Sequence, residues 1–175
     1  MAYRKGDTVL YGTQGVCCIT DITEREFKGT YTRYYILKPV YDSRSTLFVP
    51  ESNQKLTAKM RRILSADEIY ELIRAIPDKD PVWIENDAER AEQYRQILSS
   101  GNRSLLMQMI KSLYLRKEAL TEKGRKLRIM DEHFFKDAER ILYDEFALVL
   151  NIRPDEVLPF IMKQIEPGKR EHPVL

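Results

Sequence analysis

The sequence predicts an α+β protein in which a small β module, residues 1–64, precedes an all-helical domain, residues 65–175. Two observations predict this division. Short segments rich in β-branched residues, with turn residues between them, fill roughly the first fifty positions. From Ser65 onward the apolar residues instead recur at helical spacing. A chain of 175 residues has room for one ordinary domain or two small ones.

The β module is expected to contain four or five short strands. Candidate strands cover residues 7–11, 16–22, 32–38 and 45–50. Gly29 supplies the turn of a hairpin loop, because glycine readily adopts backbone conformations with positive φ. Strands this short and this closely spaced predict a small, strongly bent barrel of the Tudor or SH3 type. Such a module lies near the lower size limit for independent folding.

The second half predicts several helices separated by clear breaks. Ser65-Ala66-Asp67-Glu68 is a capping signal for a first short helix, which Pro77 ends. Gly101 and Asn102 suit a helix end and turn, and Pro154 suits a first helical turn. Further helices are expected near residues 87–98, 105–115, 134–150 and 154–161, with a basic loop at 121–128.

Composition argues for a globular cytoplasmic protein, which we expect to be a monomer. Hydrophobic residues make up 43% of the chain and charged residues 32%. No apolar run approaches the roughly 20 residues that cross a bilayer, and no secretion signal is present at the N-terminus. Cys17 and Cys18 are adjacent, a spacing that disfavours a disulfide, so we expect free thiols in a reducing cytoplasm.

The residues needed for catalysis or metal binding are not found together. His133 and His172 have no second ligand at a useful spacing, so no metal site is expected. The segment 12–15 lacks the Lys-Ser or Lys-Thr of a phosphate-binding loop. Asp131 and Glu132 lie early in a helix, where carboxylates complement the helix dipole. We therefore expect no enzyme activity and no cofactor.

Binding to a polyanion is the remaining possibility, and the charge is strongly segregated. Residues 65–89 carry 2 basic residues against 8 acidic ones, whereas residues 90–140 carry 12 against 7. Phosphate groups could bind the basic loop, with help from arginines on preceding elements. The alternative is a solvated helix surface of mixed charge. The loop residues are Lys123, Arg125, Lys126 and Arg128, and the preceding arginines are Arg90, Arg95 and Arg103.

Trp83 is the only tryptophan, and it stands in a polar, acidic stretch broken by Pro77 and Pro81. One interpretation is that the indole fills the seam between the two halves, because large aromatic side chains are usually buried. The other is that it is presented to a partner as a wedge or stacking platform. The residues alone leave both open.

The order of motifs resembles the CarD family of bacterial transcription regulators. The β module carries 5–11, 22–29, 34–38 and 48–50, reading KGDTVLY, ITEREFKG, YYILK and FVP. The second half agrees through the hinge tryptophan, 98–101 (LSSG), 113–116 (LYLR) and 138–142 (AERIL). The first module is similar to the polymerase-interacting domain shared with transcription-repair coupling factor.

This resemblance implies a function without sequence-specific DNA recognition. Members of the family bind the β subunit of bacterial RNA polymerase through the Tudor-like module. Their helical domain contacts promoter DNA at the upstream edge of the transcription bubble, where a tryptophan wedges into the minor groove and hinders bubble collapse. Trp83 falls on the wedge position, Arg90 matches a DNA-contacting basic position, and Arg25 matches a polymerase-contacting one.

Two departures accompany the resemblance. Phe48 stands at a second polymerase-contacting position that is usually basic in relatives. The stretch from Trp83 to Gly101 is longer by about one helical turn, ~4 residues. Two other functions therefore remain open: an adaptor that binds polymerase without touching DNA, and a sequence-tolerant nucleic-acid binder that acts without polymerase.

Overall fold

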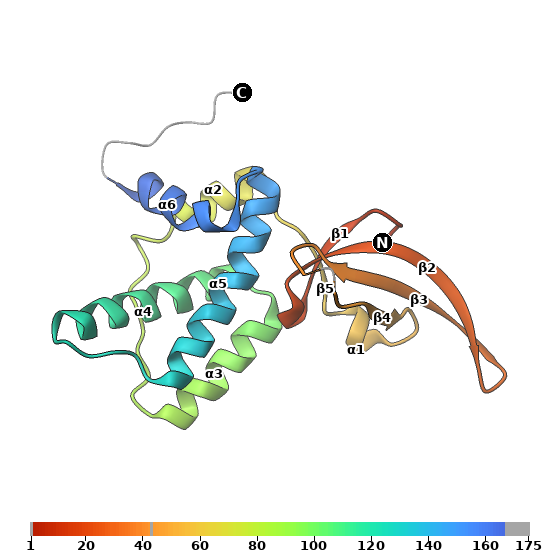
Figure 1. Ribbon diagram of the computed structural model, residues 1–175, viewed down its shortest axis with the longest axis horizontal. Coiled ribbons are helices and arrows are strands. Elements are labelled where there is room, and N and C mark those ends of the chain that lie inside the picture. The colour runs from red at the N-terminus through yellow and green to blue at the C-terminus, as the bar shows by residue number, and fades with distance from the viewer. Residues whose placement is uncertain (1, 43, 167–175) are drawn as a thin grey trace. The chain divides into compact units, whose positions relative to one another are not determined.

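The computed structural model describes residues 2–42 and 44–166 of the chain. It divides into two compact units, one of Met1–Ile63 with Ser99–Gly101, and the other of Leu64–Leu98 with Asn102–Leu175. Five strands lie in the first unit, and the longer helices lie in the second, so the predicted α+β class is confirmed (Figure 1). His172 lies outside the described residues.

The first unit is built on one antiparallel sheet with the strand order β4-β3-β2-β1-β5. Its core lies on one face of this sheet, where alternate side chains of neighbouring strands meet. The residues of that core are Val9, Cys17, Ile19, Tyr35, Leu37, Val49 and Met60. The strands are β1 (Thr8–Tyr11), β2 (Val16–Phe27), β3 (Thr30–Pro39), β4 (Leu47–Pro50) and β5 (Met60–Arg62).

Strands β2 and β3 form a long, curved hairpin (Figure 1). Its turn consists of Lys28 and Gly29, which both have positive φ, 52° and 76°. Two such residues suit the tight turn that matches the twist of paired strands. A register shift between Ile19 and Asp21 marks an irregularity where the sheet bends. The predicted hairpin is confirmed, with strands that extend further toward the turn than expected.

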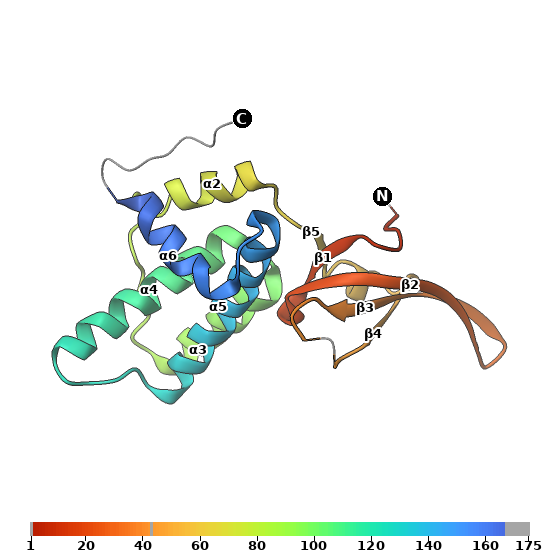
Figure 2. The same ribbon diagram turned by 45° about the horizontal axis from the view of Figure 1, so that its top comes forward.

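Six α-helices are present in the described part of the chain, besides the short 3-10 helix η1 (Gly12–Gln14). The first is a single turn, α1 (Gln54–Thr57), in the β unit. The helical unit contains the other five, and Figure 2 shows α2 and α6 side by side, in agreement with their contacts. They are α2 (Ala66–Arg74), α3 (Asp87–Ser100), α4 (Arg103–Glu122), α5 (Ile129–Leu150) and α6 (Pro154–Ile165).

Local signals explain where several helices begin. Ser65 and Glu68 form the predicted capping box at α2, and Asn102 caps α4 through its side chain. Pro154 occupies the first turn of α6, which tolerates Pro159 inside it. The helix α4 is longer than predicted, because it continues to Glu122 before Gly124 turns the chain at a φ of 68°. The segments α1 and β5 were not predicted.

Candidate functional site

The strand register places Arg25 and Phe48 on the same face of the sheet. Arg25 is opposite Thr32, and Phe48 is opposite Ile36. Because Thr32 and Ile36 are four residues apart on β3, they point to one face, and so do their partners. The Arg25 guanidinium lies 4.7 Å from the centroid of the Phe48 ring. The structure therefore brings together two residues that are 23 positions apart in the sequence.

This face is the outer face of the sheet. The alternate residues Tyr35 and Leu37 are buried in the core, whereas Tyr34 and Ile36 are only half-buried. Phe48 is 44% exposed, and Arg25 is exposed as well. An exposed cation–π contact contributes about 0.5–1 kcal/mol, which holds the two side chains together without removing them from solvent. The pair is available to a partner.

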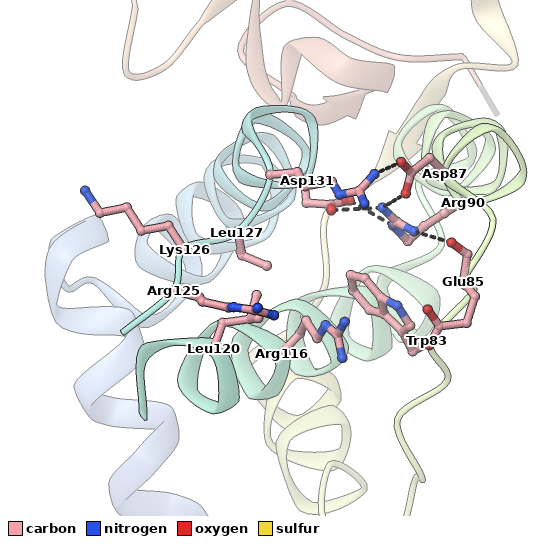
Figure 3. Close-up of a pocket in the computed structure, with 11 residues that line it drawn as sticks. Trp83, Glu85, Asp87, Arg90, Arg116, Leu120, Arg125, Lys126, Leu127 and Asp131 are labelled. Carbon is pink, nitrogen blue, oxygen red and sulfur yellow. Dashed lines mark hydrogen bonds and ion pairs between the residues drawn. The ribbon is translucent and has the colours of Figure 1, made fainter. Parts of the chain in front are cut away.

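Trp83 belongs to a second site, a pocket of about 390 Å³ within the helical unit (Figure 3). The segment before α3 contributes Trp83, α3 contributes Arg90, and α4 contributes Arg116. The loop after α4 and the start of α5 complete the wall. The full lining is Trp83, Glu85, Asp87, Arg90, Arg116, Leu120, Arg125, Lys126, Leu127, Arg128 and Asp131.

Arg90 is the most buried cation of this site, with only 1% of its surface exposed. Its Nε and Nη2 atoms donate to the Asp131 carboxylate at 2.8 and 2.9 Å, and Nη2 also donates to Asp87 at 2.8 Å. Nη1 donates to the Ile84 carbonyl at 2.7 Å and to the Glu85 carbonyl at 3.4 Å. All five N–H donors of the guanidinium are thus directed at acceptors inside the protein.

Electrostatics keep this buried guanidinium charged. Burial opposes the charge, but hydrogen bonds to Asp131 and Asp87 outweigh burial, so the pKa of Arg90 is raised. Burial also raises the pKa of the neighbouring Tyr94 to about 12, and the Asp131 carboxylate adds to that shift. The sequence predicts that Arg90 contacts DNA from the surface, but in the structure the Arg90 side chain is buried. The structure assigns Arg90 to the interior, because Asp131 and Asp87 occupy its donors.

The Trp83 indole is half-buried and contacts two guanidinium groups. The Arg90 guanidinium carbon lies 4.4 Å from the ring centroid, and that of Arg116 lies 4.9 Å away. Arg116 itself is exposed on α4. Each contact favours an indole that stays in place, since the ring face attracts a cation. The ring is therefore held within the helical unit and still partly accessible.

The four residues of the predicted basic loop occupy different positions. All are exposed. Arg125 and Lys126 line the Trp83 pocket, and Arg128 lines it while pairing with Asp87. Lys123 caps the end of α4 and does not line that pocket. The structure thus places three of the four basic residues in the lining of the Trp83 pocket.

Comparison with known families identifies the β unit. Residues 3–64 match the family model of the CarD-like/TRCF RID domain. This segment is a CarD-like RNA polymerase-interacting domain. Domains of this family are Tudor-like and non-catalytic, in agreement with the bent antiparallel sheet. The protein is accordingly an RNA polymerase-interacting, transcription-related protein.

The RID domain contains the Arg25–Phe48 pair and ends before the Trp83 pocket. The family match therefore says nothing about this pocket, whose role has to be argued from its own residues and contacts. No helix in the described ranges is both long enough and apolar enough to cross a membrane.

Arg116 and Asp131 are the site residues that sequence reasoning missed. The sequence predicts a helix only to about residue 115, whereas α4 continues to Glu122, so Arg116 lies within the helix and lines the pocket with Trp83. Asp131 matched the common pattern of a carboxylate in a first helical turn, and its pairing with Arg90, 41 residues away, is visible only in three dimensions.

Proposed function

We propose that this protein binds the β subunit of bacterial RNA polymerase and stabilises the open promoter complex. In this proposal the RID domain binds polymerase through the outer sheet face that carries Arg25 and Phe48. The helical unit contacts promoter DNA at the upstream edge of the bubble, with Trp83 in the minor groove. The protein acts as a monomer in the bacterial cytoplasm and needs no cofactor.

The observation that carries the proposal is the combination of a RID domain with an accessible tryptophan among cations. Arg116, Arg125 and Lys126 form no ion pair with a carboxylate in the described part of the chain. Glu85 is the one acidic residue of the pocket lining that is not itself ion-paired in those residues. Three cations against one carboxylate favour the approach of a polyanion.

The polymerase contact is supported by the exposed Arg25–Phe48 pair. Phe48 replaces a cation that relatives usually carry, so one charged contact is exchanged for an aromatic ring. That ring orients Arg25 and adds apolar contact area. Exposed aromatic and arginine side chains are the types that contribute most to binding at protein interfaces.

Capture of purified RNA polymerase by immobilised protein tests the first half of the proposal. Arg25→Glu should reduce capture at least about tenfold, because a charge-assisted contact contributes about 1.5–3 kcal/mol. Phe48→Ala should also reduce it, by removing the ring that holds Arg25. Lys55→Glu, an equal charge reversal at an exposed position on α1, is the matched control and should leave capture unchanged.

A promoter-opening assay on the same polymerase tests the second half. The wild type should lengthen the lifetime of open complexes, and Trp83→Ala should shorten it while leaving polymerase capture intact. Capture without any effect on opening would instead identify a polymerase adaptor. Salt-dependent binding to naked duplex, equal with and without polymerase, would identify a polymerase-independent nucleic-acid binder.

A further inference from the structure

The segment that carries Trp83 has no regular structure of its own. Residues 80–85 lie in neither a helix nor a strand, and α3 begins only at Asp87. Pro81 lies within this segment and has no backbone N–H to donate. Val82, the neighbour of Trp83, is 71% exposed, so it packs little against the helices. The position of the indole therefore depends on how the two ends of the segment are held.

Arg90 holds the C-terminal end of the segment. Its Nη1 atom donates to the carbonyls of Ile84 and Glu85 at 2.7 and 3.4 Å, and Ile84 directly follows Trp83. The same guanidinium lies beside the indole, with its carbon 4.4 Å from the ring centroid (Figure 3). One buried cation thus contacts both the ring and the backbone next to it.

Lys111 holds the N-terminal end of the segment from α4. Its Nζ atom donates to the carbonyls of Ile76 and Lys79 at 2.7 and 2.6 Å, and the side chain is half-buried. These carbonyls follow the end of α2, where a cation also complements the helix dipole. The Lys79 side chain in turn donates to the Ser104 hydroxyl. Ser104 and Lys111 are seven positions apart, so one face of α4 makes both contacts.

The chain between these two anchors is short. Residues 80–83 separate Lys79 from Ile84, so the distance between the anchored carbonyls is at most about 18 Å. Fixing both ends of so short a segment removes most of its conformational freedom, even though no helix or strand forms there. The indole is thus restrained by backbone contacts on both sides of it as well as by its own contacts.

We propose that Lys111 is a positioning residue for Trp83, which it holds in place together with Arg90 by anchoring the two ends of the segment. Lys111 touches neither the indole nor the lining of the Trp83 pocket, and acts only through the backbone. The value of this positioning for transcription rests on the proposed function. A ring that is already ordered in the free protein loses less conformational entropy when it binds.

Fluorescence of the free protein tests the positioning without DNA or polymerase. Because Trp83 is the only tryptophan, time-resolved anisotropy separates a ring that turns with the whole protein from one that moves independently. Lys111→Met keeps an unbranched side chain and removes both hydrogen bonds. The ratio of independently moving to anchored rings should rise at least about tenfold, because a hydrogen bond from a charged donor contributes more than a factor of ten.

Two further variants separate this role from a loss of charge or of stability. Lys111→Arg keeps the charge and the donors, so it should restore most of the anchored population. Lys163→Met removes an exposed lysine on α6 and should match the wild type. If Lys111 only stabilises the end of α2, Lys111→Met would lower the melting temperature and leave the anisotropy of the folded protein unchanged. That result would overturn the inference.

An insertion provides a test that leaves Lys111 in place. Two glycines inserted between Asp80 and Pro81 lengthen the segment while keeping both anchors and every helix. The independently moving population should rise here as well, because a longer segment between the same anchors has more conformations. Anisotropy equal to that of the wild type would show that the anchored ends do not position the ring, whether or not Lys111→Met folds.

The lifetime of open complexes tests the consequence for the proposed function. Lys111→Met should lower the lifetime at saturating protein toward that of Trp83→Ala, with polymerase capture unchanged, and Lys111→Arg should recover most of it. A lifetime equal to the wild type, where Trp83→Ala shortens it, would overturn the functional role of Lys111 alone. If the wild type has no effect on open complexes, the proposed function fails, and the anisotropy still decides whether Lys111 positions Trp83.

Discussion

At the level of single residues, the Arg90–Asp131 pair determines how Trp83 is held. Both partners are buried, with side chains 2% exposed, and Asp87 closes the network from the surface. A buried ion pair is not itself strong evidence of stability, because desolvation opposes the attraction. Removing only one member of the pair is strongly destabilising, because the remaining charge stays in the interior without a partner.

Asp131→Ala should therefore lower the free energy of unfolding by about 3–5 kcal/mol, as expected when one member of a buried pair is removed. Chemical denaturation followed by circular dichroism measures this change. Asp137→Ala, an exposed carboxylate on the same helix, should change stability by less than about 0.5 kcal/mol. Equal effects of the two substitutions would show that the Arg90 network does not stabilise the helical unit.

Trp83 has an intermediate environment and should give an intermediate result. Trp83→Ala removes two cation–π contacts and a half-buried ring, so we expect the free energy of unfolding to fall by about 1–2 kcal/mol. A buried core aromatic would cost about 3–5 kcal/mol. Because Trp83 is the only tryptophan, its fluorescence reports on this position alone. Emission that is blue-shifted and resistant to quenchers, with a destabilisation above about 3 kcal/mol, would contradict an accessible wedge.

At the level of helices and strands, local sequence signals predicted most of the architecture. The turn at Lys28-Gly29, the capping box at Ser65 and the proline at 154 each determine a boundary through nearby residues. The strand β5 was missed because it is short and pairs with the distant strand β1, and the helix α1 was missed because it is a single turn, capped by Asn53 and packed against the nearby β4. Short-range patterns therefore explain the elements that they cap or turn, and do not explain those formed by long-range contact.

The site was predictable to a similar extent. The residues Arg25 and Phe48 were found through a family resemblance, whereas Trp83 stood out from the sequence as the only tryptophan, and the structure adds the contacts of each. The assignment of Arg90 to a DNA surface could not be checked from sequence, because its acceptor Asp131 is 41 positions away. A basic residue and an acidic residue at that separation carry no mutual signal in a single chain.

The loop between α4 and α5 gives a prediction for a single element. Binding to the promoter complex weakens as salt rises, and the slope of the logarithm of the binding constant against the logarithm of salt concentration counts the phosphates that are bound. Arg125→Ala combined with Lys126→Ala should lower this salt slope by about two units, one for each phosphate that the loop no longer binds. Arg128→Ala should lower it by less, because Arg128 is paired with Asp87 in the free protein. Binding of labelled promoter measured at several salt concentrations gives the slopes. Slopes equal to that of the wild type for all variants would show that the loop is only a solvated connection.

In the molecule as a whole, one chain carries two separate sites. The RID domain binds polymerase, and the helical unit carries the Trp83 pocket. Binding through one unit raises the effective concentration of the other near its target. Under the proposed function, the two sites should therefore contribute to the same effect in different ways, one through occupancy of polymerase and the other through the proposed contact with DNA.

The lifetime of open promoter complexes as a function of protein concentration tests this division of roles. Arg25→Glu should shift the curve to higher concentration and reach the wild-type plateau, because it weakens occupancy alone. Trp83→Ala should keep the wild-type midpoint and reach a lower plateau, because polymerase is still bound but the proposed wedge is missing. A Trp83→Ala curve identical to that of the wild type, or a lowered plateau without a shift for Arg25→Glu, would contradict the division.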